Sequence, residues 1–565
     1  MSKLEQFILI SLGFLIFEVI FIRIGFFFGS PIGSCTLLLS FVMYCAALTY
    51  LYSSSIFQIK QKIKSYIPIF LFIIVSLLLS GVSILLSNTY DTSWDGQGYH
   101  QSAVIALASN WNPIKEPLIH FKQNLPSQIY AESYPSALWE IEATIYSLTH
   151  RINSAKIMNI VIAIIAGMIF YSLLRKLKFG KILSYVISFF IVLQPMYLIQ
   201  LLTFMEDGFG YELLLIATAS FAITIVAPKS YWAIATFIMA ELLLVTTKYS
   251  NLPVALVLGS LFALFIINCF LNKEYVLSRY TKYFLIGSIL VASIFAYLPY
   301  GRNQIAHGAL FYPANTPALM GNVIFNSVPT NLLEHNKLTL LFYGIFSKSQ
   351  TEESGDPRNK SNLAELKIPF TFSLSELNDS AKLYNNRVGA GGPLFSGIIV
   401  LSVLLVFFLY FKTENFKERY AIYTSVFGLI LILILSLFTP APNLLRYVNE
   451  LQLIPFVIII PIYVVFKKTY TQIFCHMLIM LVGLNIFLFS IAVFNKTLLE
   501  TKEINKQFQD MRNSRIEYQV NAQQFYSSYY ILEEQNISYY AVDNFRCHNT
   551  KQLLASSTTT QLCDK

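Results

Sequence analysis

Charged residues are scarce in this sequence of 565 residues: Asp, Glu, Lys and Arg together make up 13% of the chain. An ordinary soluble domain has roughly 25%. Hydrophobic residues make up 55% and aromatic residues 15%. The composition therefore excludes an ordinary soluble enzyme and indicates an integral membrane protein.

Acidic residues are fewer than basic ones, 31 against 40, which gives a net charge of +9. In a soluble protein this excess would suggest a nucleic-acid partner. Here most of the clustered basic residues lie in short links between apolar runs. We therefore interpret them as topology signals, and we expect a lipid bilayer and no nucleic acid around this chain.

Cysteine is also rare, with six residues. Four of them, at positions 35, 45, 269 and 475, lie in or at the edge of apolar runs and have no metal-ligand spacing, so we interpret them as small buried side chains. Cys547 and Cys563 lie in the polar tail. They could form a disulfide if the tail faces an oxidising compartment, and the sequence leaves this open.

Long apolar runs recur as far as about residue 495, and a run of about 20 residues crosses a bilayer as a helix. We predict an all-α polytopic membrane protein with about thirteen transmembrane helices. Their expected spans are 6–28, 33–54, 66–87, 155–174, 182–202, 209–227, 231–247, 252–271, 283–300, 392–411, 420–439, 451–466 and 470–494. The first run continues past residue 22 without an A-x-A-like cleavage site, so we expect it to be retained.

The links between these runs alternate in charge. The basic links carry Lys60/Lys62/Lys64, Arg175/Lys176/Lys178/Lys181, Lys229, Lys273/Arg279/Lys282, Lys412/Lys417/Arg419 and Lys467/Lys468. The positive-inside rule makes these links cytoplasmic and puts the N-terminus inside. Two long loops, 88–154 and 301–391, then face outward. The membrane module is expected to end at residue 494, and 495–565 to form an outward tail or small domain.

Two carboxylates, Asp91 and Asp95, open the first outward loop. The stretch 99–109 is compatible with a helix, so Asp95 is expected at or just before its first turn. Backbone N–H groups at a helix start favour an ionised carboxylate. Asp95 is therefore either a helix cap and nothing more, or a functional acid at the membrane surface.

The third outward link contains two adjacent acids, Glu206 and Asp207. Acids between apolar runs are costly unless water or partners reach them, so they are functional candidates, although a solvated turn would also explain them. Lys248 lies at the outward end of a short apolar run. It either belongs to a site or extends to the lipid headgroups.

Two arginines lie at the same outer boundary. Arg302 opens the second long loop, and Arg446 lies between two late apolar runs. A guanidinium binds phosphate through two parallel hydrogen bonds, so both residues are candidates for a phosphate site. A single arginine is also a common interfacial anchor. Interfacial anchoring explains less well why acids, a lysine and two arginines all lie on the same predicted side of the membrane.

Short motifs follow one another along residues 66–466. They are Trp94-Asp95, Tyr99-His100, Asn112-Pro113, Tyr134-Pro135, Pro195 and Gln200 ahead of Asp207, Thr247-Lys248-Tyr249-Ser250, Arg302-Asn303, Tyr312-Pro313 and Arg446-Tyr447. This series resembles the membrane glycosyltransferases of the GT-C fold. It looks closest to the bacterial dolichyl-phosphate-mannose protein mannosyltransferase-like and aminoarabinose-transferase-like members. Two departures leave the subfamily open: Ser136 stands where many relatives have a second proline, and three apolar runs precede the aspartate instead of one.

The resemblance implies an enzyme that transfers a sugar from a polyprenyl-phosphate carrier to a glycan, lipid or protein acceptor outside the cytoplasm. Asp95 would be the general base, with Asp91 as its rival, and the reaction would invert the anomeric centre. The donor phosphate would bind to Lys248, Arg302 and Arg446. The acceptor, or a divalent cation such as Mg²⁺ or Mn²⁺, would meet Tyr99, His100, Glu206 and Asp207. The expected location is a bacterial inner (plasma) membrane, with the site facing the periplasm or exterior.

Three other classes remain open. An O-antigen or capsule polymerase or ligase would also use lipid-linked sugars, but around outward arginines. A transporter should show internal repeats and polar residues near the middle of the membrane, whereas here Glu18 and Arg23 are the main intramembrane charges. A noncatalytic membrane scaffold is the third alternative.

Overall fold

The computed structural model describes residues 1–54, 59–118, 126–228, 230–272, 279–317, 324, 327–349, 363–382, 387–545, 550–556 and 560–564. The chain divides into two compact units. Unit 1 comprises Met1–Ile169, Leu201–Asn315 and Leu499–Lys565, and unit 2 comprises Phe170–Gln200 and Thr316–Leu498. Three residues named above, Lys229, Lys273 and Cys547, lie outside the described residues.

Unit 1 is mainly helical. Its helices are α1 (Lys3–Phe27), α2 (Thr36–Ser54), α3 (Ile59–Leu86), η1 (Gly96–His100), α4 (Gln101–Ala108), α5 (Pro126–Ser133), α6 (Ala137–Thr149), η2 (Ile152–Lys156), α10 (Asp207–Val226), α11 (Tyr231–Thr247), η3 (Tyr249–Asn251), α12 (Leu252–Leu271), α13 (Arg279–Ala296), η4 (Tyr297–Gly301), α14 (Arg302–His307) and α22 (Ser527–Glu534). Helix α7 (Ile157–Lys176) begins in unit 1 and ends in unit 2.

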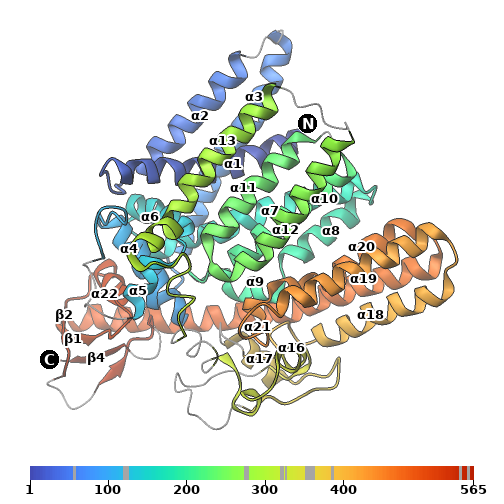
Figure 1. Cartoon of the computed structure of the whole chain (residues 1–565). Coiled ribbons are helices and arrows are strands. Elements are labelled where there is room, and N and C mark those ends of the chain that lie inside the picture. Colours follow the sequence, from blue (N-terminus) through green and yellow to red (C-terminus); the bar gives the residue numbers. More distant parts are fainter. Residues whose placement is uncertain are drawn as a thin grey trace. The chain divides into compact units, whose positions relative to one another are not determined.

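Helix α1 begins with a capping box, in which the side chains of Ser2 and Glu5 bond each other's backbone N–H groups. It packs against α2, α3 and α11. Rings of Phe14, Phe41 and Phe72 pack edge to face or stacked between α1, α2 and α3, with centroids 5.5 to 5.7 Å apart. Helices α10 and α11 lie side by side along their length (Figure 1). This packing fixes the helix ends from which the candidate site residues project.

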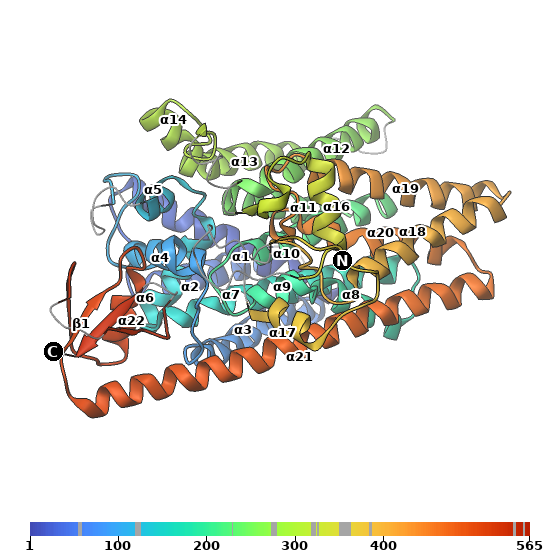
Figure 2. The same ribbon diagram turned by 90° about the horizontal axis from the view of Figure 1, so that it is seen from below.

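The tail contains a small sheet, whereas the sequence predicts an all-α chain. The strands are β1 (Tyr518–Asn521), β2 (Tyr539–Ala541), β3 (Lys551–Gln552) and β4 (Gln561–Asp564), in the order β2-β1-β4-β3. Strands β1 and β2 are parallel, so a crossover must connect them, and α22 supplies it. Strand β4 pairs antiparallel with β1 and with β3. Helix α22 lies beside α4 in both views (Figures 1 and 2).

Unit 2 is a second helical body. Its elements are α8 (Lys181–Val192), α9 (Pro195–Gln200), η5 (Thr330–Leu332), α16 (Lys337–Phe346), α17 (Leu374–Lys382), α18 (Phe395–Lys412), α19 (Phe416–Ser436), η6 (Leu445–Tyr447), η7 (Asn449–Leu453) and α20 (Ile454–Val465). Helices α18, α19 and α20 pack together (Figure 1). Helix α21 (Thr469–Ser514) begins in unit 2 and ends in unit 1.

Eight helical stretches of the described chain are long and apolar enough to cross a membrane. They are Lys3–Phe27, Tyr66–Leu86, Ile152–Lys176, Asp207–Val226, Tyr249–Leu271, Phe395–Lys412, Phe416–Ser436 and Thr469–Ser514. Shorter apolar helices occupy Thr36–Leu51, Lys181–Val192, Tyr231–Thr247, Lys337–Phe346 and Asn449–Val465. The chain is thus a mostly helical integral membrane protein. The number of thirteen spans remains a prediction. So does the side of the membrane on which each loop lies.

Candidate active site

Asp95 lies at the start of the helical part of the first predicted loop. It directly precedes the π-helix η1, which continues into α4. Its side chain is half-buried and makes no hydrogen bond that caps the helix. The helix starts slightly earlier than the sequence predicts, and Asp95 occupies the N-cap position of η1 without a capping hydrogen bond from its side chain.

Asp91, four residues earlier, is fully buried. Its Oδ1 accepts a hydrogen bond from the backbone N–H of Ser93 and its Oδ2 one from the backbone N–H of Phe204, both over 2.7 Å. Burial raises the pKa of the Asp91 carboxyl, and these hydrogen bonds oppose the rise. A Cβ at Gly96 would collide with Asp91 Oδ2, so this approach requires glycine. Asp91 thus joins the first loop to the turn that precedes α10.

Tyr99 and His100 lie inside the fold, because less than a tenth of each residue is exposed. The Tyr99 ring packs against the rings of Tyr130 and Tyr134, with centroids 5.2 and 5.7 Å away. The indole N–H of Trp139 donates to Nδ1 of His100 over 2.9 Å. Nδ1 of His100 is therefore the acceptor in this contact. Both residues attach η1 to α5 and α6.

Two further acids are buried, Glu142 on α6 within the first loop and Glu206 directly before α10. Burial raises the pKa of both well above the ordinary value; the negative charge of Asp91 adds to the rise at Glu142. At Glu206 the Lys248 ammonium opposes the rise and the neighbouring acids Glu142 and Asp207 add to it. Among the described residues, Oε2 of Glu142 and Oε1 of Glu206 have no hydrogen-bond partner. Burial therefore favours the protonated form of both carboxyl groups.

Asp207 and Lys248 form a buried ion pair, with 2.5 Å between Nζ and Oδ1. Asp207 is the first residue of α10, where the helix dipole favours a carboxylate, and Lys248 directly follows α11. The ammonium group thus points inward to Asp207 and is not extended to the surface. The solvated turn suggested for Glu206 and Asp207 is wrong, because both acids are buried.

A hydrogen-bonded node joins four motifs that are far apart in the sequence. The Tyr249 hydroxyl donates to the backbone oxygens of Ser133 (2.8 Å) and Tyr312 (3.1 Å). The Asn303 amide donates to the same two oxygens and to the Tyr249 hydroxyl, over 2.8 to 2.9 Å. The Tyr134 ring packs edge to face on Tyr249 at 5.3 Å. The motifs at 133–135, 248–250, 302–303 and 312–313 therefore meet in one place.

Arg302 lies next to this node and is half-buried. One guanidinium nitrogen, Nη1, donates to the backbone oxygen of Glu132 over 2.6 Å. A guanidinium has five N–H donors, and within the described part of the chain this is its one hydrogen bond to protein. The Arg302 group therefore keeps donors for an anion.

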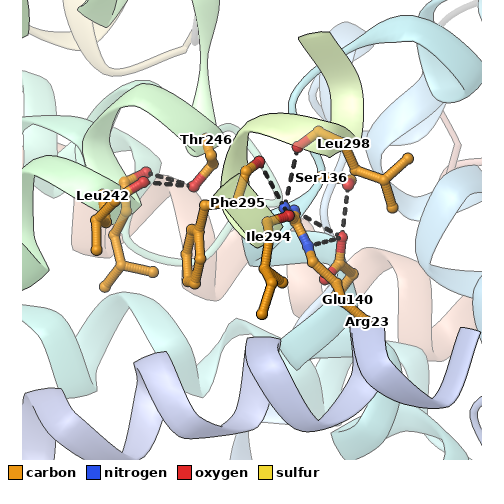
Figure 3. A network of polar contacts seen from close by, with 9 residues as sticks. Arg23, Ser136, Glu140, Leu242, Thr246, Ile294, Phe295 and Leu298 are labelled. Carbon is orange, nitrogen blue, oxygen red and sulfur yellow. Dashed lines mark hydrogen bonds and ion pairs between the residues drawn. The ribbon is translucent and has the colours of Figure 1, made fainter. Parts of the chain in front are cut away.

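A buried ion pair that the sequence does not predict fixes the segment leading to Arg302. Nε and Nη2 of Arg23 donate to the Glu140 carboxylate over 2.9 to 3.2 Å (Figure 3). Nη1 donates to the backbone oxygens of Ile294, Phe295 and Leu298 over 2.7 to 3.2 Å. The hydroxyl of Ser136 also donates to Glu140. These bonds tie together α1, α6 and the end of α13.

Arg446 lies in unit 2, on the short helix η6, and is mostly buried. Its Nη2 is 3.3 Å from the Tyr447 hydroxyl, and its guanidinium lies 4.9 Å from the centre of the Tyr447 ring. This contact is a cation–π arrangement. Arg446 is thus held by its neighbour in the sequence.

The described residues contain no group of three or more His, Cys, Asp or Glu side chains that could hold a metal ion. Glu206 and Asp207 instead point to different partners, since Oε1 of Glu206 lies 3.7 Å from Nδ1 of His100 and Asp207 bonds Lys248. Sequence reasoning misses Glu142, and it misses Glu140 as the partner of Arg23. A charge inside a long apolar run needs a buried partner, and this was the signal available for Arg23.

No family model, no curated protein and no solved structure matches this chain. Its function is therefore inferred from the residues and their geometry.

Proposed function

We propose that this protein is a membrane glycosyltransferase that moves a sugar from a polyprenyl-phosphate carrier to an acceptor hydroxyl on the non-cytoplasmic face. The observation that carries the proposal is the meeting of the short motifs in unit 1. The segments at 133–135, 248–250, 302–303 and 312–313 share one hydrogen-bonded node. Independent interfacial anchors would have no reason to converge in this way.

Asp95 is the proposed general base. It takes the proton of the acceptor hydroxyl while the acceptor oxygen forms a bond to the anomeric carbon. Its half-buried side chain supports this role, whereas the two oxygens of Asp91 already accept backbone hydrogen bonds inside the fold. Asp95 is thus favoured over Asp91.

Arg302 is the proposed anchor of the donor phosphate. As the bond from the anomeric carbon to the phosphate oxygen breaks, that oxygen keeps the electron pair, and a fixed cation stabilises the charge. Among the residues that the structure describes, its guanidinium makes one hydrogen bond to protein, which supports this role. A single displacement with one base inverts the anomeric centre.

Lys248 stays a proposed second phosphate ligand, with Asp207 orienting its ammonium group. Arg446, in unit 2, stays a candidate phosphate ligand on the sequence motif alone. Tyr99 and His100 are proposed to support the acceptor side from within the fold, because they are buried. A divalent cation such as Mg²⁺ or Mn²⁺ stays an alternative partner proposed for Glu206 and Asp207.

The tail and the first loop are proposed to lie outside the cytoplasm together, in a bacterial inner membrane. The buried contacts between them, such as that of Gln97 with Ala555, support placing both on one side of the bilayer. Cys563 is disulfide-bonded, which supports an oxidising compartment.

The test is sugar transfer by the purified protein in lipid vesicles. Polyprenyl-phosphate-linked sugars are offered with acceptors from the host envelope, and the products are identified by mass spectrometry. The expected result is a new glycoside with inverted anomeric configuration and release of polyprenyl phosphate. Transfer from nucleotide sugars alone, or transport of substrate without a new bond, would overturn the proposal.

A further inference from the structure

Gln97, two residues after Asp95, is completely buried. Its amide nitrogen donates to the backbone oxygen of Asp91 over 2.7 Å and to the backbone oxygen of Ala555 over 2.6 Å. A buried amide is costly unless it is paired, and here both N–H groups have a partner. Gln97 thus links the loop that carries Asp95 to the tail, across 458 residues of sequence.

The tail touches the Asp95 segment on both sides of the aspartate. Before it, the Trp94 ring meets the Phe525 ring edge to face, with centroids 5.9 Å apart. After it, the Ser527 hydroxyl donates to the backbone oxygen of Gln97 over 3.4 Å. Phe525 and Ser527 are themselves fully buried. The backbone of Asp95 is therefore held between two contacts that the tail supplies.

A second set of contacts joins the tail to the far end of the same loop. Nη1 of Arg151 donates to the backbone oxygen of Glu534 over 2.9 Å, and the backbone N–H of Ile152 donates to Glu534 Oε1 over 2.8 Å. These bonds attach the tail without touching residues 91–100. They provide a matched control for the contacts at Gln97.

We infer that the described tail residues 515–545 and 550–556 form a positioning domain for the general base, and that Gln97 is the positioning residue through which this domain acts. This inference rests on the proposed function. A one-ångström displacement of a reacting group can lower turnover about 100-fold. Loosening the Gln97 contact should therefore lower turnover while donor binding, which involves Arg302, is kept.

The first experiment measures the segment itself. Hydrogen–deuterium exchange is followed in the full-length protein for residues 92–99, comparing wild type, Gln97→Leu and Arg151→Ala. We expect faster exchange at 92–99 in Gln97→Leu and no change there in Arg151→Ala. Because Gln97→Leu could disturb folding, Phe525→Leu serves as a second variant, which loosens the contact with Trp94 from the tail side. Unchanged exchange at 92–99 in both Gln97→Leu and Phe525→Leu would overturn the inference.

The second experiment measures catalysis by the same proteins. We expect kcat to fall about 10- to 100-fold in Gln97→Leu with the KM for the donor within about 2-fold of wild type, and normal values in Arg151→Ala. Normal kcat despite faster exchange would overturn the positioning role. The proposed function fails separately, by the absence of transfer in wild type, and the exchange result still decides whether the tail holds the segment.

Discussion

A carboxyl group buried like that of Glu142 favours its protonated form, so its pKa in the folded state lies well above the value of 4.5 in the unfolded chain. The folded state therefore binds a proton that the unfolded state has released. Stability from this group is kept below about pH 4.5 and is lost as the pH rises toward the folded-state pKa.

Replacing Glu142 with Gln removes the ionisable group while keeping the shape. We expect the melting temperature of Glu142→Gln in detergent to match wild type near pH 4.5 and to exceed it at pH 8. The reason is that a pKa difference of one between the folded and unfolded states corresponds to about 1.4 kcal/mol. The exposed Glu414→Gln is the control. Equal pH dependence in wild type and Glu142→Gln would show that Glu142 is ionised in the fold.

Arg302 is the cation with the clearest capacity for a phosphate. A charge-assisted hydrogen bond contributes about 1.5–3 kcal/mol, so Arg302→Gln should lower kcat/KM for the donor by roughly 10- to 150-fold and leave acceptor KM unchanged. Steady-state kinetics with each substrate varied in turn measures this. The control is Arg512→Gln, an exposed arginine that bonds Gln535 in the tail. An equal loss of kcat/KM for the donor and for the acceptor would show that Arg302 does not bind the donor phosphate.

At the scale of elements, the Arg23 and Glu140 pair decides where the end of α13 lies. Breaking a buried pair by removing one partner costs about 3–5 kcal/mol, because the other charge stays buried. Glu140→Gln should therefore lower the melting temperature strongly, and the double variant Arg23→Met with Glu140→Met should recover most of the loss. The exposed pair Lys348 and Glu365 is the control, and Lys348→Ala should melt like wild type. A double variant as unstable as Glu140→Gln would contradict this account.

At the scale of the whole molecule, the contacts between the first loop and the tail predict that both lie on one side of the membrane. In a background without Cys35, Cys45, Cys269 and Cys475, single cysteines at Asn110 and Gln523 should react with an impermeant maleimide in intact cells. A cysteine at Glu414, in a basic link, should react only after permeabilisation. All three positions are exposed. If one of the cysteines at positions 110 and 523 reacted in intact cells and the other only after permeabilisation, the described packing of the tail would be excluded.

Much of the helical layout could be predicted from the sequence, because runs of apolar residues have a length that the bilayer sets. The helix at Tyr231–Thr247 has the predicted bounds. The tail sheet could not be predicted, since strands of two to four residues show no clear alternation.

The site was predicted in part. Asp95, Lys248 and Arg302 belong to short motifs, and these motifs identified them as candidate site residues. All three lie in unit 1 of the structure. Gln97 could not be recognised in this way, because its role depends on the backbone oxygen of Ala555, 458 residues away in the sequence. Glu140 is likewise 117 residues from Arg23. Partners so distant in the sequence have no spacing that could reveal them.

The most direct test of the proposed chemistry compares sugar transfer by Asp95→Asn and Asp91→Asn, per mole of folded protein. Asn resembles Asp in shape but cannot accept the proton, so Asp95→Asn should lower turnover by about 10²–10⁴-fold with normal melting. Asp91→Asn should mainly lower the melting temperature, because its amide group cannot accept both backbone hydrogen bonds. Near-normal transfer by Asp95→Asn would contradict the account, and an inactive but stable Asp91→Asn would assign the base to Asp91.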